Sequence, residues 1–292
     1  MDVVRWDSVP QLRHPLVITA FEGWNDAGDA ASLALSFLGQ AWKAERFATV
    51  DPEEFFDFTA TRPQTRIVEG VTRTIDWPAV EILAATVPDV DRDVVLVRGT
   101  EPQLRWRTFT DAIVGVAKRV QAELALSLGA LLADVPHTRP VRVTGTTDDQ
   151  ELSDRLGLVR SSYEGPTGII GVLASAYEQV GVPSASFWAA VPHYVHQVPS
   201  PKAALALVER AAALLGARVN PLELRVAAEE YERQVSERVA EDDDAVAYVA
   251  QLEEADDEQA TGGVVGGLPL NADADTLAAE VESFLRHHRG EQ

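Results

Sequence analysis

The sequence predicts an α/β fold, in which a mostly parallel sheet is covered by helices on both faces. The first observation is a strand–turn–helix corner. The apolar run Leu16–Phe21 is typical of a buried strand, and apolar residues at helical spacing follow over residues 27–38. The second observation is that apolar strands and amphipathic helices continue to alternate up to about residue 215. The third is a change of composition after Pro221, where an acidic, helix-forming segment begins.

The rest of this α/β part follows from apolar runs and from their spacing. Apolar positions at helical spacing predict one long helix from Trp106 to Leu128, with Gly129 ending it, and a nearly charge-free helix over 168–180. The alternating stretch 65–76 predicts a hairpin that turns at Glu69–Gly70 and adds antiparallel strands. The other predicted strands are 47–50, 81–86, 94–98, 130–135, 141–145, 158–163 and 185–191, and the other helices are 148–156 and 202–215.

Four parts are predicted along the chain: an α/β domain over 1–220, an acidic helical hairpin over 221–260, a glycine-rich linker over 261–270 and a C-terminal helix over 271–292. The first helix of the hairpin carries an apolar stripe at spacings of three and four. Its members are Leu224, Ala228, Tyr231, Val235 and Val239. We expect this stripe to pack on the second helix of the hairpin or on a neighbouring subunit, because such a helix is poorly stable alone.

Charge and composition exclude several classes of function. The formal net charge is −21, and residues 221–292 hold 19 acidic but only 5 basic side chains. Nucleic acid and anionic membrane surfaces are therefore disfavoured as partners. The chain has no cysteine and no apolar run near the roughly 18 residues of a membrane span. We expect a cytoplasmic protein whose acidic third is a solvated surface or a docking face for a basic partner.

Four polar loops are expected to meet at the carboxyl edge of the sheet, where open α/β sheets place ligands. They are residues 22–29, 99–102, 136–138 and 164–168. The carboxylates of the first loop argue against a simple phosphate site, although Thr167 before a glycine-lined helix start suits an anion. The candidate cleft comprises Glu22, Gly23, Trp24, Asn25, Asp26, Gly99, Glu101, His137, Glu164, Gly165, Thr167 and His193.

The sequence offers candidate catalytic residues but no recognised catalytic motif. His137 and His193 each follow an apolar strand, so either is a candidate general base or a structural hydrogen-bonding group. The sequence contains no G-x-S-x-G, H-E-x-x-H, G-x-G-x-x-G or P-loop motif. We therefore name no nucleophile and expect no metal and no cofactor.

Five blocks of the sequence resemble the proteasome-assembly-chaperone-2 family in its bacterial members. They are Phe21–Asp29, Gly99–Trp106, Leu128–Pro140, Tyr163–Gly171 and Ser186–Tyr194. The resemblance implies a three-layer α/β fold like that of nucleoside phosphorylases and related hydrolases. It also implies self-association, as a trimer, and a protein partner related to the proteasome, whose α-ring the eukaryotic members help to assemble.

Two functions follow as hypotheses. The leading one is a non-enzymatic protein-binding or assembly module. The alternative is an enzyme acting on a small molecule, nucleoside-like or an amide, at the carboxyl edge; only fold analogy supports it. A closed pocket with convergent polar groups would favour the enzyme, and an exposed apolar patch would favour the module.

Overall fold

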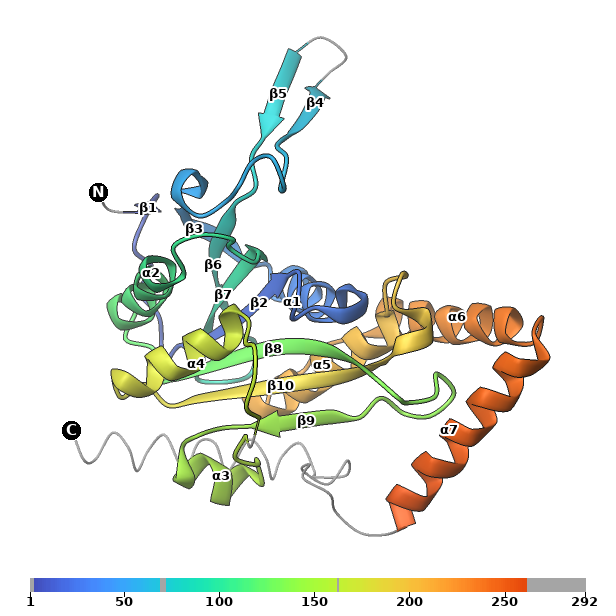
Figure 1. Ribbon diagram of the computed structural model, residues 1–292. Coiled ribbons are helices and arrows are strands. Elements are labelled where there is room, and N and C mark those ends of the chain that lie inside the picture. Colours follow the sequence, from blue (N-terminus) through green and yellow to red (C-terminus); the bar gives the residue numbers. More distant parts are fainter. Residues whose placement is uncertain (1–2, 69–71, 162, 262–292) are drawn as a thin grey trace.

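The computed structural model describes residues 3–68, 72–161 and 163–261 (Figure 1). The predicted linker from residue 262 onward and the predicted C-terminal helix lie outside the described residues. The centre of the molecule is an eight-stranded sheet with the strand order β1-β3-β6-β7-β2-β8-β10-β9. Its strands are β1 (Val4–Trp6), β2 (Leu16–Glu22), β3 (Glu45–Val50), β6 (Val80–Thr86), β7 (Asp93–Thr100), β8 (Leu124–Ala133), β9 (Val143–Thr146) and β10 (Ser184–Pro192).

The four central strands β7, β2, β8 and β10 pair in parallel, as the alternation of strands and helices predicts. Antiparallel strands flank this centre: β6, β3 and β1 on one side and β9 on the other. The central strands are apolar on both sides because helices cover both faces. In β2, for example, every residue from Leu16 to Phe21 is buried.

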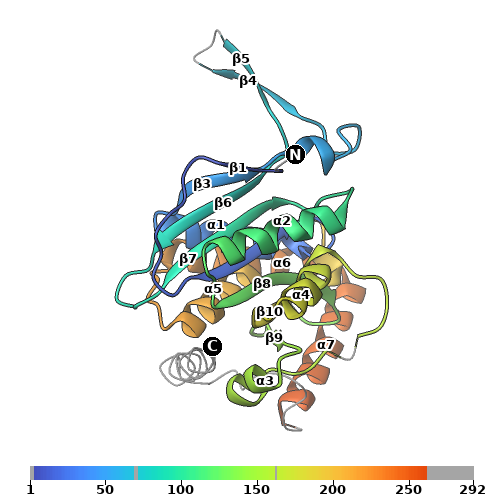
Figure 2. The same cartoon turned by 90° about the vertical axis from the view of Figure 1, so that its left-hand side faces the viewer.

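The helices form the outer two of three layers (Figure 2). Helices α1 (Ala30–Ala41) and α5 (Pro201–Leu215) share one apolar core with the sheet, and α2 (Trp106–Arg119) and α4 (Ile169–Gln179) share the core on the other face. The short helix α3 (Gln150–Leu156) joins the first core beside β9. The three-layer α/β fold is therefore confirmed.

The long helix predicted from Trp106 to Leu128 is wrong. Helix α2 ends at Arg119, and residues from Leu124 onward form the buried central strand β8. Gln121, with φ of 58°, makes the left-handed turn that separates them. Gly129 ends no helix; it lies within β8, where a Cβ would come within 2.6 Å of the Trp188 ring.

Two smaller predictions also need correction. The strand predicted over 158–163 is reduced to a single bridge between Val159 and Thr146. The predicted hairpin forms, with β4 (Gln64–Val68) and β5 (Thr72–Asp76), but it is a separate two-stranded sheet and not an addition to the main one. It projects away from the body (Figure 1), and its predicted turn at Glu69–Gly70 lies outside the described residues.

The C-terminal helices pack on the α/β body. Helix α6 (Leu222–Val239) runs along α5 and buries Ala228, Tyr231 and Val235 there. Helix α7 (Asp243–Thr261) diverges from α6 (Figure 1) and forms ion pairs with the segment after β8, including Arg139 with Asp257 at 2.9 Å. The expectation that the apolar stripe packs on its own hairpin or on a neighbour is therefore corrected: its main partner is α5.

Candidate functional site

The corner between β2 and α1 is fixed by backbone geometry and by an acidic cap. Gly23, with φ of 127°, allows the chain to turn out of the strand. The Oδ1 atom of Asp26 accepts hydrogen bonds from the backbone N–H groups of Ala31 at 2.7 Å and Ser32 at 3.2 Å. Asp26 thereby satisfies free donors in the first turn of α1, which also favour a negative charge.

Glu101 ties three of the predicted loops together. Its Oε1 atom accepts hydrogen bonds from the side-chain amide of Asn25 at 3.1 Å and from the backbone N–H of Ile169 at 2.8 Å. Its own backbone N–H donates to the carbonyl of Glu22 at 2.8 Å. Gly168 allows α4 to approach this closely, because a Cβ at its position would lie only 2.0 Å from the side-chain amide of Asn25. The loops after β2 and β7 and the start of α4 are thus held in one place.

Beside this junction lies a cleft of about 1100 Å³. It begins at the carboxyl ends of β2 and β8 and continues along α4 over β9 and β10, so its walls come from segments far apart in the sequence. We call it the α4 cleft. Its volume exceeds the roughly 300–1,000 Å³ of sites that enclose a small molecule.

Large apolar side chains stand exposed around the α4 cleft. Each of these side chains is between 45% and 65% exposed: Trp24, Leu131, Leu132, Tyr163 and Val198. Several large exposed apolar side chains around one cleft, with polar neighbours, are typical of protein interaction sites. The sequence alone does not predict that Leu131 and Leu132 are exposed, because both belong to the mainly apolar strand β8, whose preceding residues are buried.

The charge of the α4 cleft has one sign. The charged side chains that line it in the described part of the chain are Asp26, Asp29 and Asp148, and no lysine or arginine does so there, although Arg160 lies 3.9 Å from Asp148. Burial raises the pKa of Asp26 to about 6, and its Oδ2 atom has no hydrogen-bond partner among the described residues. The cleft is therefore suited to a partner that is apolar and positively charged.

The predicted site residues separate into four groups. Gly23, Trp24, Asn25, Asp26, Gly165 and Thr167 line the α4 cleft. Glu22, Gly99 and Glu101 support it from the neighbouring strand ends. Glu164 is exposed beside Gly165 and does not line it. His137 and His193 lie elsewhere, because the segments after β8 and β10 turn toward the C-terminal helices, so their place in the predicted cleft is corrected.

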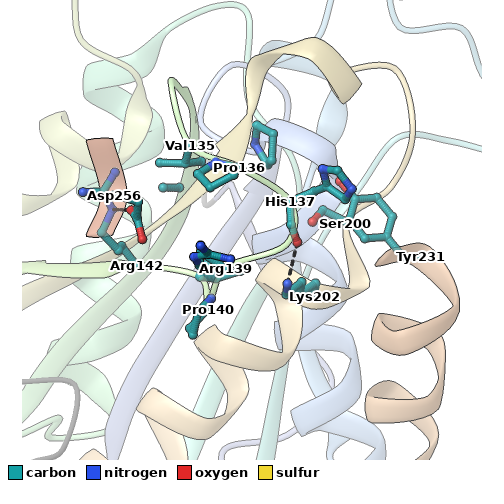
Figure 3. A pocket seen from close by; sticks show the side chains of 13 residues that line it. Val135, Pro136, His137, Arg139, Pro140, Arg142, Ser200, Lys202, Tyr231 and Asp256 are labelled. Atoms are coloured by element: carbon teal, nitrogen blue, oxygen red, sulfur yellow. Dashed lines mark hydrogen bonds and ion pairs between the residues drawn. The ribbon is translucent and has the colours of Figure 1, made fainter. Parts of the chain in front are cut away.

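His137 lies in a small pocket beside α6 and the start of α5 (Figure 3). The volume of this pocket, about 10 Å³, is at the lower limit for one water molecule. The ring Nδ1 is 2.8 Å from the Tyr194 hydroxyl and the ring Nε2 is 3.0 Å from the Ser236 hydroxyl, while Lys202 donates to the His137 carbonyl. Burial, with the nearby Lys202 charge, lowers the pKa of His137. This arrangement holds α6 in place and leaves no room for a substrate.

His193 is a second structural group. Its Nδ1 atom is 3.0 Å from a carboxylate oxygen of Asp134, and its ring packs edge-on against Tyr194 and against Tyr248 of α7. The described residues contain no cluster of three or more histidine or acidic side chains arranged to hold a metal.

Comparison with known proteins decides the family. The sequence model of the PAC2 family matches residues 20–239. The chain belongs to the PAC2 family. No curated protein matches it significantly.

Solved structures agree with this family assignment. A PAC2 family protein from Streptomyces avermitilis is 44% identical, with a TM-score of 0.76, over 80% of this chain and 99% of that one. A Mycobacterium tuberculosis proteasome-assembly chaperone homologue is 46% identical, with a TM-score of 0.73 and the same coverage. A second M. tuberculosis protein, of unknown function, is 28% identical over 97% of this PAC2 chain and 96% of its own, with a TM-score of 0.80. In the described part of the PAC2 chain, the helices are all too short or too polar to cross a membrane.

Proposed function

We propose that this PAC2 protein is a non-enzymatic assembly module that acts as a proteasome-assembly-chaperone-like protein. Its relationship to the M. tuberculosis proteasome-assembly chaperone homologue supports a protein partner, in our proposal a proteasome-related one. The observation that carries the proposal is the rim of the α4 cleft. Exposed Trp24 and Tyr163 are large aromatic side chains of the kind that proteins bury against one another.

The enzymatic alternative has less support. Among the described residues, no hydrogen-bonded pair of nucleophile and base lines the cleft. Oδ1 of Asp26 caps α1, and Nδ1 of His196, the histidine that lines the cleft, is 2.8 Å from the backbone carbonyl of His193. A catalytic base is normally placed within hydrogen-bond reach of the group that it activates.

We further propose that the protein self-associates in the cytoplasm as a homotrimer, the state that its resemblance to the family implies. Two apolar surfaces support self-association: the rim of the α4 cleft and the exposed strands β4 and β5. Closed symmetric oligomers are the usual way in which a soluble chain covers such surfaces.

Sedimentation velocity with purified proteasome α-subunits tests the proposal. The wild-type protein is expected to sediment as a trimer and to shift to a larger species when α-subunits are added. The double variant Trp24→Asp/Tyr163→Asp is expected to lose the shift, because two charges on the apolar rim oppose its burial. Val246→Asp is the matched control, since Val246 is also an exposed apolar residue but lies on α7 outside the cleft. A shift that survives in the double variant contradicts a role for the cleft, and no shift with the wild type contradicts the proposed partner.

A further inference from the structure

The β4–β5 hairpin is a second unpartnered surface. Its strands make extensive contact only with each other, and both expose their side chains to solvent. The cross-strand pairs Thr65–Ile75 and Ile67–Arg73 lie on one face of the ribbon. On this face Ile67 is 60% and Ile75 is 56% exposed.

An isolated two-stranded hairpin is marginally stable in water and normally needs packing on one face. Here Ile67 and Ile75 occupy the face that also carries Arg73, while the opposite face carries the ion pair between Arg66 and Asp76 and the exposed Val68. The hairpin therefore has one face with two exposed isoleucines, which is the more apolar one, and one mixed face that carries an ion pair.

The charge on the apolar face complements the α4 cleft. Arg73 is exposed and forms no ion pair with any residue that the structure describes. The cleft is lined by two exposed carboxylates, and none of its described lining residues is a lysine or arginine. Asp148 before α3 is 3.9 Å from Arg160, whereas Asp29 at the start of α1 forms no ion pair with a described residue. An apolar surface with a single cation thus matches an apolar surface with an excess of carboxylates.

We propose that the apolar face of the hairpin of one copy docks in the α4 cleft of a second copy. Ile67 and Ile75 then cover the part of the rim at Leu131 and Leu132, and Arg73 pairs with Asp29. The part of the rim formed by Trp24 and Tyr163 is left to the proteasome-related partner. The inference rests on the self-association proposed above and identifies the surfaces that make it.

The position of the hairpin favours a second copy over the same chain. The hairpin follows β3, which runs parallel to the central strands and ends at the same sheet edge as β2 and β8. It then projects away from the body (Figure 1). Because the two surfaces in the contact differ, the contact is head-to-tail, and such contacts generate closed rings when the rotation between copies allows it.

The absence of native cysteine permits a direct test by cross-linking. Ile67→Cys and Leu132→Cys replace exposed side chains, so both variants are expected to fold, which circular dichroism checks. The two variants are mixed in equal amounts, allowed to exchange subunits and treated with a short bismaleimide. The mixture is expected to give at least fivefold more covalent dimer than either variant alone. Ile67→Cys mixed with Val226→Cys, an exposed position on α6, is the matched control.

A second variant tests the charge pairing. Adding Arg73→Glu to Ile67→Cys is expected to lower the cross-linked yield at least fivefold, and Arg73→Lys is expected to keep most of it. If the mixture gives no more dimer than the single variants while the protein still sediments as an oligomer, the docking of hairpin and cleft is wrong and self-association uses another surface. If the protein is a monomer at all concentrations, both this inference and the proposed self-association are wrong, whereas binding to α-subunits is tested separately.

Discussion

The carboxylate of Glu101 accepts a hydrogen bond from the side-chain amide of Asn25, with 3.1 Å between Oε1 and Nδ2. The same oxygen accepts the backbone N–H of Ile169 at the start of α4. One carboxylate oxygen therefore fixes the β2–α1 corner relative to α4, and both of these elements line the α4 cleft.

Replacing Glu101 with alanine is expected to lower the free energy of unfolding by about 1–3 kcal/mol, because the Asn25 amide and the Ile169 N–H lose their acceptor. Urea denaturation measures the change. Glu164→Ala is the control, since Glu164 is exposed, and its effect is expected to stay within about 0.5 kcal/mol. Equal effects of the two variants would show that Glu101 does not hold the corner.

Asp26→Asn is expected to stabilise the protein at neutral pH. The pKa of Asp26 is raised from 3.8 to about 6, mainly by burial. Between these two pKa values the folded state keeps a proton that the unfolded state has released. The free energy of unfolding therefore falls as the pH rises, and the whole destabilising effect of Asp26 is present above pH 6. The variant should gain about 1–2 kcal/mol at pH 7.5 and progressively less as the pH falls toward 4. Urea denaturation across this range, with Asp29→Asn as the exposed control, measures the gain; a gain that is independent of pH would contradict the explanation.

Helix α6 is expected to detach more readily in mild acid. Burial and the Lys202 charge lower the pKa of His137, although Glu232 and Glu253 oppose this effect. The unfolded histidine therefore takes up a proton at a higher pH than the folded one. Its stabilising contribution is complete above pH 6.5 and is lost as the pH falls below that value. Limited proteolysis of residues 222–258 at pH 7.5 and 5.5 measures this opening, and His137→Gln, which does not titrate there, should remove most of the difference between the two pH values.

Tyr231→Asp combined with Val235→Asp is expected to cost several kcal/mol of local stability, because both side chains are buried against the α/β body. The central sheet should survive, since its core lies elsewhere. Val226→Asp is the matched control on the same helix, where the side chain is 57% exposed. Protease sensitivity confined to residues 222–258 in the double variant supports the packing, and wild-type resistance would mean that α6 is a solvated appendage.

The sequence predicts the β2–α1 corner and the three-layer fold because burial on both faces leaves apolar runs that can be recognised without coordinates. It misplaces the boundary between α2 and β8, because Gln121 makes the left-handed turn without the glycine that usually marks one. The sequence does not predict that β6 and β9 run antiparallel to their neighbours, because strand direction depends on pairing between distant segments. Likewise, the departure of His137 and His193 from the cleft depends on the packing of α6 and α7, which no local pattern encodes.

The central claim is that the α4 cleft serves protein assembly, and the rate at which purified proteasome subunits assemble tests it most directly. Native electrophoresis over time measures this rate for α- and β-subunits alone, with the wild-type protein and with Trp24→Asp/Tyr163→Asp. The account predicts that the wild type accelerates assembly severalfold, that Val246→Asp does so equally and that the double variant does not. Equal acceleration by the double variant, or none by the wild type, would contradict it.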